Sequence, residues 1–166
     1  VLDGTDNFAT RFLLNDVCGR DGIPWVYGGA TGADGSGRVV LPGSDRPCLR
    51  CLIPEPPPNH ALATCETQGV LGPTVDAVAA WQAAQALRIL VGDPGATARG
   101  MMQLDAWSGV SRLAFTQAKR RHDCASCGTG EWPATQQSGP RLVSLCGRDA
   151  VQIRPGAPST VDLESL

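Results

Sequence analysis

The sequence feature that most constrains the fold of this chain is a pair of Cys-x-x-Cys motifs. The first hook contains Cys48 and Cys51, and the second hook contains Cys124 and Cys127. Each hook bends two sulfur atoms toward one point, and together they supply the four thiolates of a closed, tetrahedral structural zinc site. Because residues 52–123 separate the hooks, the ion would join two distant parts of one fold. The alternatives are two disulfides or two buried thiol pairs.

The composition fits one globular domain with a hydrophobic core. Of the 166 residues, 42% are hydrophobic and 18% are charged, and the formal net charge is -2, which argues against a nucleic-acid or membrane-surface partner. The basic residues 119–122 are isolated and are expected to be a solvated segment. No apolar run of about 18 residues and no signal-peptide pattern occur, so we expect a cytoplasmic protein.

The remaining cysteines favour a reducing compartment. The chain has seven cysteines, and Cys18, Cys65 and Cys146 stand singly, with no spacing that suggests disulfide bridges. Cys65 lies on the approach to a long helix and could be a nucleophilic thiol. Only His60 lies near it in the sequence to lower its pKa, so a loop cysteine without a role is an equally good interpretation.

Polar residues follow what is predicted to be the end of a buried parallel strand at the N-terminus. In doubly wound α/β folds the carboxyl ends of strands point into the ligand crevice, which places Asp6 and Asn7 where a metal-bound nucleotide would sit. A helix is predicted over residues 8–19, with Arg11 and Asn15 four residues apart on one face. Both could therefore flank the same site. The alternative is that Asp6 or Asn7 only caps this helix.

The glycine-rich residues 28–37 match neither the dinucleotide-binding nor the P-loop pattern, so they do not support phosphate binding. We expect instead a strand over residues 25–27, a turn at Asp34 and Gly35, and an antiparallel return over residues 38–41. Further strands are expected over residues 101–107, 112–116, 142–145 and 150–153.

A proline-rich loop and a long helix occupy the middle of the chain. The proline density of residues 53–60 excludes helix and central strand, which predicts an extended, exposed segment. Residues 73–91 form the clearest helix, with proline at its start and Gly92 at its end. Because this helix is so apolar, we expect it to be mostly buried. Its alanines would let another helix or a partner subunit approach closely. Its apolar face consists of Val75, Val78, Ala79, Ala86, Ile89 and Leu90.

Several motifs occur in order along residues 1–128. They are Leu2-Asp3-x-Thr5-Asp6-Asn7 with Arg11 and Asn15, Pro47-Cys48-x-Arg50-Cys51-Leu52, Cys65-x-x-x-Gly69-Val70, the long helix and Cys124-x-x-Cys127. Together they resemble the C-terminal part of the ThiF/MoeB/HesA family, prokaryotic relatives of ubiquitin-activating E1 enzymes. The resemblance implies the C-terminal part of a Rossmann-like E1 adenylation fold, which is α/β with a mixed sheet, covering helices and a four-cysteine zinc site. Residues 52–72 would form its crossover loop, and residues 129–166 a loop-rich tail or the start of a C-terminal extension.

The resemblance also implies an activity. Family members use ATP and magnesium to adenylate the C-terminal Gly-Gly of a ubiquitin-like sulfur carrier of the ThiS or MoaD type, in thiamine, molybdopterin or related sulfur pathways. Asp6 resembles the family's magnesium and nucleotide aspartate, and Arg11 resembles the arginine five residues after it. Such a carboxylate would hold magnesium and so offset charge that develops at the attacked phosphate. Cys65 falls in the crossover loop, where some members carry a thiol that bonds to the carrier's activated end. The family forms homodimers, which the apolar helix would fit.

Other family features are absent from this sequence. It lacks the glycine-rich nucleotide loop, the ribose-binding acid, the phosphate-contacting lysine and the arginine finger that the family carries upstream, so we expect no tight ATP binding. Gln85 stands where many relatives have glutamate, which we interpret as a surface or interface change.

Two further functions stay open. One is a non-catalytic, zinc-stabilised module that binds a ubiquitin-like carrier or a partner subunit, and the other is a thiol sulfurtransferase centred on Cys65.

Overall fold

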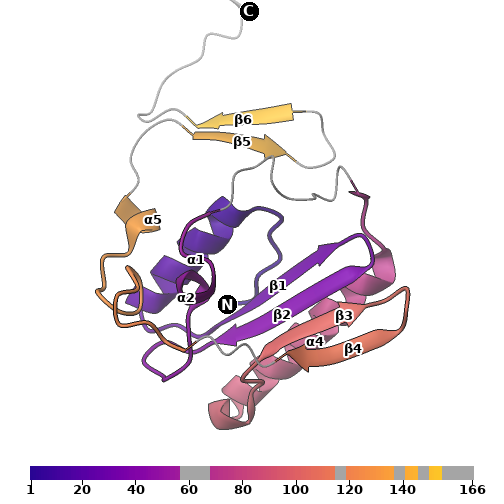
Figure 1. Cartoon of the computed structure of the whole chain (residues 1–166), viewed down its shortest axis with the longest axis horizontal. Coiled ribbons are helices and arrows are strands. Elements are labelled where there is room, and N and C mark those ends of the chain that lie inside the picture. The colour runs from indigo at the N-terminus through magenta and orange to yellow at the C-terminus, as the bar shows by residue number, and fades with distance from the viewer. Residues whose placement is uncertain (57–67, 115–118, 137–140, 146–149, 155–166) are drawn as a thin grey trace, which may run out of the picture.

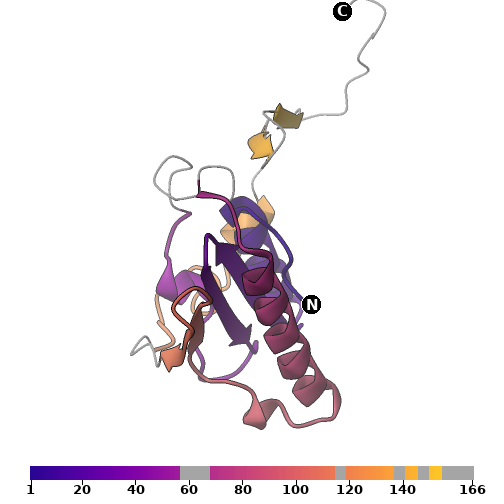
Figure 2. The ribbon, with the colours of Figure 1, turned by 90° about the vertical axis from the view of Figure 1, so that its right-hand side faces the viewer.

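A four-stranded sheet forms the centre of the fold, and the long helix α4 lies across one of its faces (Figures 1 and 2). The computed structural model describes residues 1–56, 68–114, 119–136, 141–145 and 150–154. The strands of the sheet, in spatial order, are β1 (Trp25–Thr31), β2 (Asp34–Val40), β3 (Met101–Asp105) and β4 (Val110–Ala114). The other elements are α1 (Phe8–Arg20), α2 (Leu49–Leu52), α4 (Gly72–Leu90), η2 (Pro94–Ala96), α5 (Pro133–Gln136), β5 (Arg141–Leu145) and β6 (Ala150–Arg154).

The named strands of this sheet all pair antiparallel, which corrects the prediction of a mixed sheet. Among the described residues, parallel pairing is limited to single bridges, one from Leu2 to Val26 and one from Gly32 to Val70. Short connections explain the pairs β1–β2 and β3–β4, because a tight hairpin can only join antiparallel strands. β2 and β3 also pair antiparallel, although residues 41–100 separate them. The α/β class and the two predicted strand pairs of the sheet are confirmed.

The β1–β2 hairpin turns two residues earlier than predicted. Asp34 and Gly35 are already in the ladder, where they pair with Thr31 and Ala30. The turn falls at Gly32, whose φ of 57° lies in the left-handed region that favours glycine. The glycine-rich sequence therefore contains two possible turns. The observed pairing of β1 with β2 uses the first, at Gly32.

Glycines on one face of β1 and β2 allow α4 to pack closely on the sheet. A Cβ atom on Gly35 would lie 2.7 Å from Val78 Cγ2, and one on Gly37 would lie 2.6 Å from the Trp81 ring. Gly28 is the cross-strand partner of Gly37 and would meet a Gln82 side chain in the same way. The glycine-rich run thus serves close packing between helix and sheet.

The face of α4 that meets the sheet carries three buried polar side chains, which the sequence did not predict. Thr74, Gln82 and Gln85 are buried there together with Val78. Gln82 Nε2 donates to the carbonyls of Asp3 and Val26, at 2.9 Å each, and Gln85 Oε1 accepts from Ala98 N. Gln85 is therefore an interior residue of this chain, which corrects its interpretation as a surface or interface change.

The opposite face of α4 carries apolar side chains at the surface. Val75 is 43% exposed and Leu90 is 80% exposed, although both were assigned to the buried apolar face. This helix is apolar on nearly every side, so its periodicity contained little information about which side meets the sheet. Hydrogen-bond partners on the sheet decided its orientation instead.

The hairpin of β5 and β6 forms a separate two-stranded sheet, which Figure 1 shows apart from the main sheet. It confirms the two strands expected over residues 142–145 and 150–153. None of the helices in the described part of the chain is both long enough and apolar enough to span a membrane.

Candidate metal centre and nucleotide site

The structure brings the two cysteine hooks together beside α1. Cys48 is the N-cap of α2, Cys51 lies inside that helix, and all four sulfur atoms lie within 4.8 Å of one another. The distances are 3.9 Å for Cys48–Cys51, 3.6 Å for Cys48–Cys124 and 3.4 Å for Cys51–Cys127. A tetrahedral ion with zinc–sulfur bonds of about 2.3 Å requires sulfur–sulfur distances of about 3.8 Å. The four cysteines therefore fit one metal ion, and the structure shows them as free thiols instead of two disulfides.

Burial raises the pKa of two of these thiols. Desolvation and the neighbouring cysteines raise the pKa of Cys48 far above its usual range, and desolvation raises that of Cys51 to about 11. Burial also opposes ionisation of Cys124, but the backbone amides of Ser126 and Cys127 donate to its sulfur and lower its pKa overall. An ion that binds here must displace protons from buried thiols.

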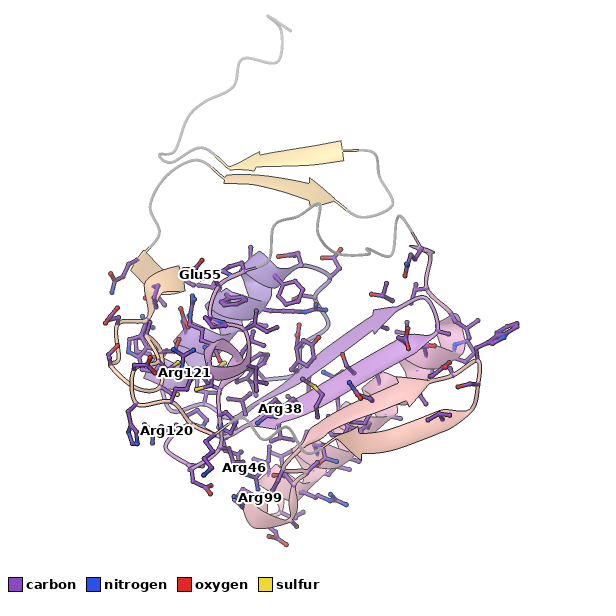
Figure 3. The ribbon with its side chains drawn as sticks, in the orientation of Figure 1. Arg38, Arg46, Glu55, Arg99, Arg120 and Arg121 are labelled. Atoms are coloured by element: carbon purple, nitrogen blue, oxygen red, sulfur yellow. The ribbon has the colours of Figure 1, made fainter. Side chains whose placement is uncertain are left out.

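Positive charges surround the cysteine cluster (Figure 3). Arg38 is 1% exposed, and its Nη2 donates to the carbonyl of Pro47 at 3.3 Å. Burial and Arg46 lower the pKa of Arg38, while Cys48 and Cys51 act in the opposite direction. Four thiolates and one divalent ion would leave two negative charges, and such cations offset them.

On the other side of the cluster, Arg120 Nη2 donates to the carbonyl of Cys127, and the amide of Arg121 donates to the Cys51 sulfur at 3.4 Å. The basic residues predicted to be a solvated segment are exposed, but two of them also contact the hooks. A pocket of about 200 Å³ opens beside Cys48 and Cys127 and offers an entry path for an ion.

The structure places Asn15 at the cysteine hooks, and its side chain is 1% exposed. Its Oδ1 accepts from Leu49 N at 2.9 Å, and its Nδ2 donates to Ser126 Oγ at 3.2 Å. Through these contacts, Asn15 has a structural role at the hooks. Its predicted contact with a nucleotide stays a prediction.

Asp16 is a functional candidate that the sequence analysis missed. It is fully buried and pairs with Arg50, whose Nη2 lies 2.9 Å from Asp16 Oδ2. The signal was present in the helix period, because Phe8, Phe12 and Asp16 recur every four residues on one stripe. A carboxylate on the buried stripe of a helix needs partners.

Asp6 and Asn7 lie at the start of α1. Asp6 is exposed and accepts from Asn7 Nδ2 at 3.1 Å. Asn7 is the N-cap of α1, and its Oδ1 accepts from Thr10 N at 2.8 Å, so the capping alternative is confirmed for Asn7. The carboxylate of Asp6 is accessible to a ligand at this helix end.

Arg11 is buried and is held by the protein itself. Its Nη2 donates to the carbonyls of Thr5 and Gly28, at 2.7 and 3.3 Å, and its Nε lies 3.4 Å from Asp3 Oδ2. α1 therefore carries Arg11 toward β1 and Asn15 toward the hooks, so the structure gives the two side chains different surroundings. Contact between Arg11 and a nucleotide stays a prediction. Cys65 and most of the predicted crossover loop lie outside the described residues.

The model of the ThiF family matches residues 1–127. The sulfur carrier protein ThiS adenylyltransferase of Bacillus subtilis is 38% identical over 168 residues, which cover 100% of this chain and 48% of that protein. The adenylyltransferase and sulfurtransferase MOCS3 of Caenorhabditis briggsae is 41% identical over 77% of this chain and 32% of its own length. The SAMP-activating enzyme E1 of Haloferax volcanii is 38% identical over 78% of this chain and 47% of its own length.

Solved structures share the fold. The E. coli MccB complex with AMPCPP and MccA matches with a TM-score of 0.57 at 15% identity, and the match covers 76% of this chain and 39% of MccB. The E. coli MccB complex with ATP matches with a TM-score of 0.55 at 16% identity and covers 76% and 38%. At this identity the likeness concerns the fold alone. The chain spans about half, or less, of the length of the curated relatives described here.

Proposed function

This chain belongs to the ThiF family, and we propose that it forms part of an enzyme that uses ATP and Mg²⁺ to adenylate the C-terminal Gly-Gly of a ubiquitin-like sulfur carrier. The observation that carries the proposal is the family match over residues 1–127, because those residues include both hooks, Asp6 and Arg11. Relatives that share this region are named as adenylyltransferases or as an activating enzyme.

The carrier that we propose is of the ThiS type, which places the reaction in thiamine biosynthesis. The similarity to the B. subtilis relative runs through the whole chain, including residues 129–166. The similarity to the C. briggsae relative covers only 77% of the chain. Residues 129–166 are, in this proposal, a C-terminal extension shared with ThiS-activating relatives. A MoaD-like carrier is the alternative substrate of the same class.

In the proposed reaction Asp6 holds Mg²⁺ at the nucleotide. Its exposed carboxylate at the start of α1 supports this role, because a ligand can reach it. Arg11 would contribute positive charge behind the phosphates, and its buried ion pair with Asp3 would hold it in position. Asn7 and Asn15 complete the predicted nucleotide contacts. Cys65 would bond to the activated end of the carrier.

The four hook cysteines are proposed to bind one structural Zn²⁺. Their sulfur–sulfur distances fit a tetrahedral ion, and all four positions are filled by protein ligands, so no position stays open for a substrate. Zinc would join the start of α2 to the segment that leads toward α5. The proposed setting is the cytoplasm, where reducing conditions keep cysteines available as ligands.

A homodimer through the outer face of α4 is also part of the proposal. Leu87, Leu90 and Val91 are 61%, 80% and 77% exposed, and neighbouring large apolar side chains at a surface are typical of a protein interface. The small residues of the same helix would allow close approach of a partner.

The test of the adenylation proposal is carrier-dependent exchange of pyrophosphate into ATP. We expect little exchange from this chain alone, and ThiS-dependent exchange when the chain is joined to the part of the B. subtilis relative that the match leaves out. No exchange by the joined protein with either a ThiS-like or a MoaD-like carrier would contradict the proposal.

The alternative is a non-catalytic, zinc-stabilised module that binds a ubiquitin-like carrier. It is favoured by the cysteine cluster, because four protein ligands around one ion would leave no open position for a substrate. Carrier capture by the joined protein without adenylate formation would support this module over the enzyme. A sulfurtransferase centred on Cys65 would be excluded if Cys65→Ser left sulfur transfer intact.

A further inference from the structure

We propose that Asn15 and Asp16 of α1 form a polar clamp that holds the two cysteine hooks face to face before any metal binds. The inference rests on the proposed zinc centre and deepens it, because it assigns the residues that preorganise the site. The hooks lie far apart in the sequence, whereas Asn15 and Asp16 are adjacent on one rigid helix.

Asn15 contacts both hooks with opposite ends of one amide. Its Oδ1 accepts from Leu49 N, which lies between Cys48 and Cys51. Its Nδ2 donates to the hydroxyl of Ser126, which lies between the two cysteines of the second hook. A single planar group therefore fixes the position of one hook relative to the other.

Asp16 makes a second connection between the same hooks, and it shares the Ser126 hydroxyl with Asn15. On the first hook, its carboxylate accepts from Arg50 Nε at 3.0 Å and from Arg50 Nη2 at 2.9 Å. On the second hook, it accepts from Ser126 Oγ at 2.5 Å. It also accepts from Ala134 N at 2.8 Å, which ties the start of α5 to the same point.

The burial of these groups makes the clamp independent of the metal. Asn15, Asp16 and Ser126 are each no more than 1% exposed, so water is not available to replace a lost partner. A buried carboxylate left without its hydrogen bonds is costly, and both hooks must be docked for all of these bonds to form. Folding of the metal-free chain would therefore already supply the free energy that is needed to bring the hooks together. An ion that binds later would find its ligands in place.

The experiment measures Zn²⁺ affinity of the whole chain by competition with a chelator under reducing conditions. Asp16→Asn removes the carboxylate, and Ser126→Ala removes the shared hydroxyl while all four sulfurs stay. Loss of such outer contacts lowers metal affinity by about 10–100-fold in other proteins, and we expect Asp16→Asn in that range. Ser126→Ala should shift affinity in the same direction, and it carries the test if Asp16→Asn does not fold.

Asp3→Asn is the matched control. Asp3 is 2% exposed and pairs with Arg11 of α1, but its side chain contacts Thr5 and Arg11 and neither hook. We expect this variant to keep the Zn²⁺ affinity of the wild type. Unchanged affinity in both Asp16→Asn and Ser126→Ala, or an equal loss in Asp3→Asn, would overturn the clamp.

A second readout uses amide hydrogen exchange in the metal-free chain. The amides of Leu49 and Ala134 should exchange slowly in the wild type and faster in Asp16→Asn. Fast exchange in the metal-free wild type that slows only after Zn²⁺ is added would overturn the clamp, because the metal would then order the hooks. A wild type that binds no Zn²⁺ would defeat the proposed metal centre, whereas slow exchange of these two amides would still support the clamp.

Discussion

At the scale of single residues, the buried polar groups of α1 divide into two sets. Arg11 pairs with Asp3 and contacts the carbonyl of Gly28 in β1. Asn15 and Asp16, little more than one turn later, contact the hooks instead. The same helix therefore positions the predicted nucleotide site with one set of side chains and the candidate metal centre with the other.

The acid sensitivity of Asp16 is a first prediction. Burial raises its pKa, but hydrogen bonds from Arg50, Ser126, Ala134 and Asn15 outweigh that effect and lower it below the usual 3.8. A lowered folded-state pKa means that the ionised group stabilises the fold above the unfolded pKa of about 3.9. This contribution is lost as the pH falls through the folded pKa.

Asp16→Asn should therefore reduce the free energy of unfolding by about 3–5 kcal/mol at pH 7. The difference from the wild type should shrink progressively below about pH 4. Urea unfolding of the reduced, metal-free chains at several pH values measures it. A difference of constant size down to pH 2 would contradict the assignment.

Asp6→Asn tests the predicted magnesium ligand. In the protein joined to the missing part of the B. subtilis relative, we expect carrier-dependent pyrophosphate exchange to fall by about 100-fold or more, because an electrostatic contact to the reacting phosphate is lost. Asp21→Asn is the control, since Asp21 is also a surface carboxylate next to α1. Equal exchange by the two variants would argue against the role of Asp6.

At the scale of elements, α4 packs closely on the β1–β2 hairpin because three hairpin residues that face it are glycines. Gly28, Gly35 and Gly37 have no side chain, which leaves room for Gln82, Val78 and Trp81. The buried amide of Gln82 then donates to the backbone carbonyls of Asp3 and Val26. Close approach and polar anchoring together set the rotation of the helix about its axis.

Gly35→Ala should destabilise this contact. The new methyl group would lie 2.7 Å from Val78 Cγ2 and 3.2 Å from Thr74 Cγ2, and both side chains are β-branched and stiff. We expect a loss of about 1–3 kcal/mol in the free energy of unfolding. Gly4→Ala serves as control because nothing lies within 4 Å of its Cβ position. Thermal unfolding of the two variants should differ clearly, and equal melting temperatures would refute the packing argument.

At the scale of the whole molecule, the candidate metal centre joins two parts of the chain, the first hook with α2 and the second hook before α5. α1 supplies no sulfur and is connected to both hooks through Asn15 and Asp16. An ion at this point would stabilise contacts that are distant in sequence, and such contacts carry the highest entropic cost.

Removal of zinc should therefore lower the stability of the entire described domain. We expect about one zinc per chain, as a single four-thiolate site requires. If the ion contributes about 3 kcal/mol, its removal by a chelator would lower the Tm by about 6–12 °C. Elemental analysis and calorimetry with and without chelator measure both quantities. A metal-free chain as purified, with a Tm that chelator does not change, would contradict the zinc centre.

The proposed homodimer is tested on the outer face of α4. Leu87→Lys should convert the dimer to a monomer in light scattering, because a charge would be buried in an apolar interface. Trp107→Lys is the control, since Trp107 is 84% exposed in the β3–β4 turn, near the start of α4. A wild type that is monomeric at micromolar concentration would contradict the proposed interface.

Local patterns in the sequence determined most elements of this protein. The spacing of Cys48, Cys51, Cys124 and Cys127 predicted one cluster, and the structure brings the four sulfurs together. Helical period and proline–glycine boundaries predicted α1 and α4 to within a few residues. Each hook and each helix boundary depends on neighbours within a few residues, so a sequence carries these patterns directly.

Only the tertiary structure decided which faces of these elements are buried. α4 is apolar on nearly every side, so its orientation followed from glycines on β1 and β2 and from carbonyls that accept from Gln82. The tasks of Asn15 and Asp16 depend on Leu49 and Ser126, which are distant in the chain. Burial and hydrogen-bond satisfaction are properties of residues that meet in space, and for that physical reason no local pattern contained them.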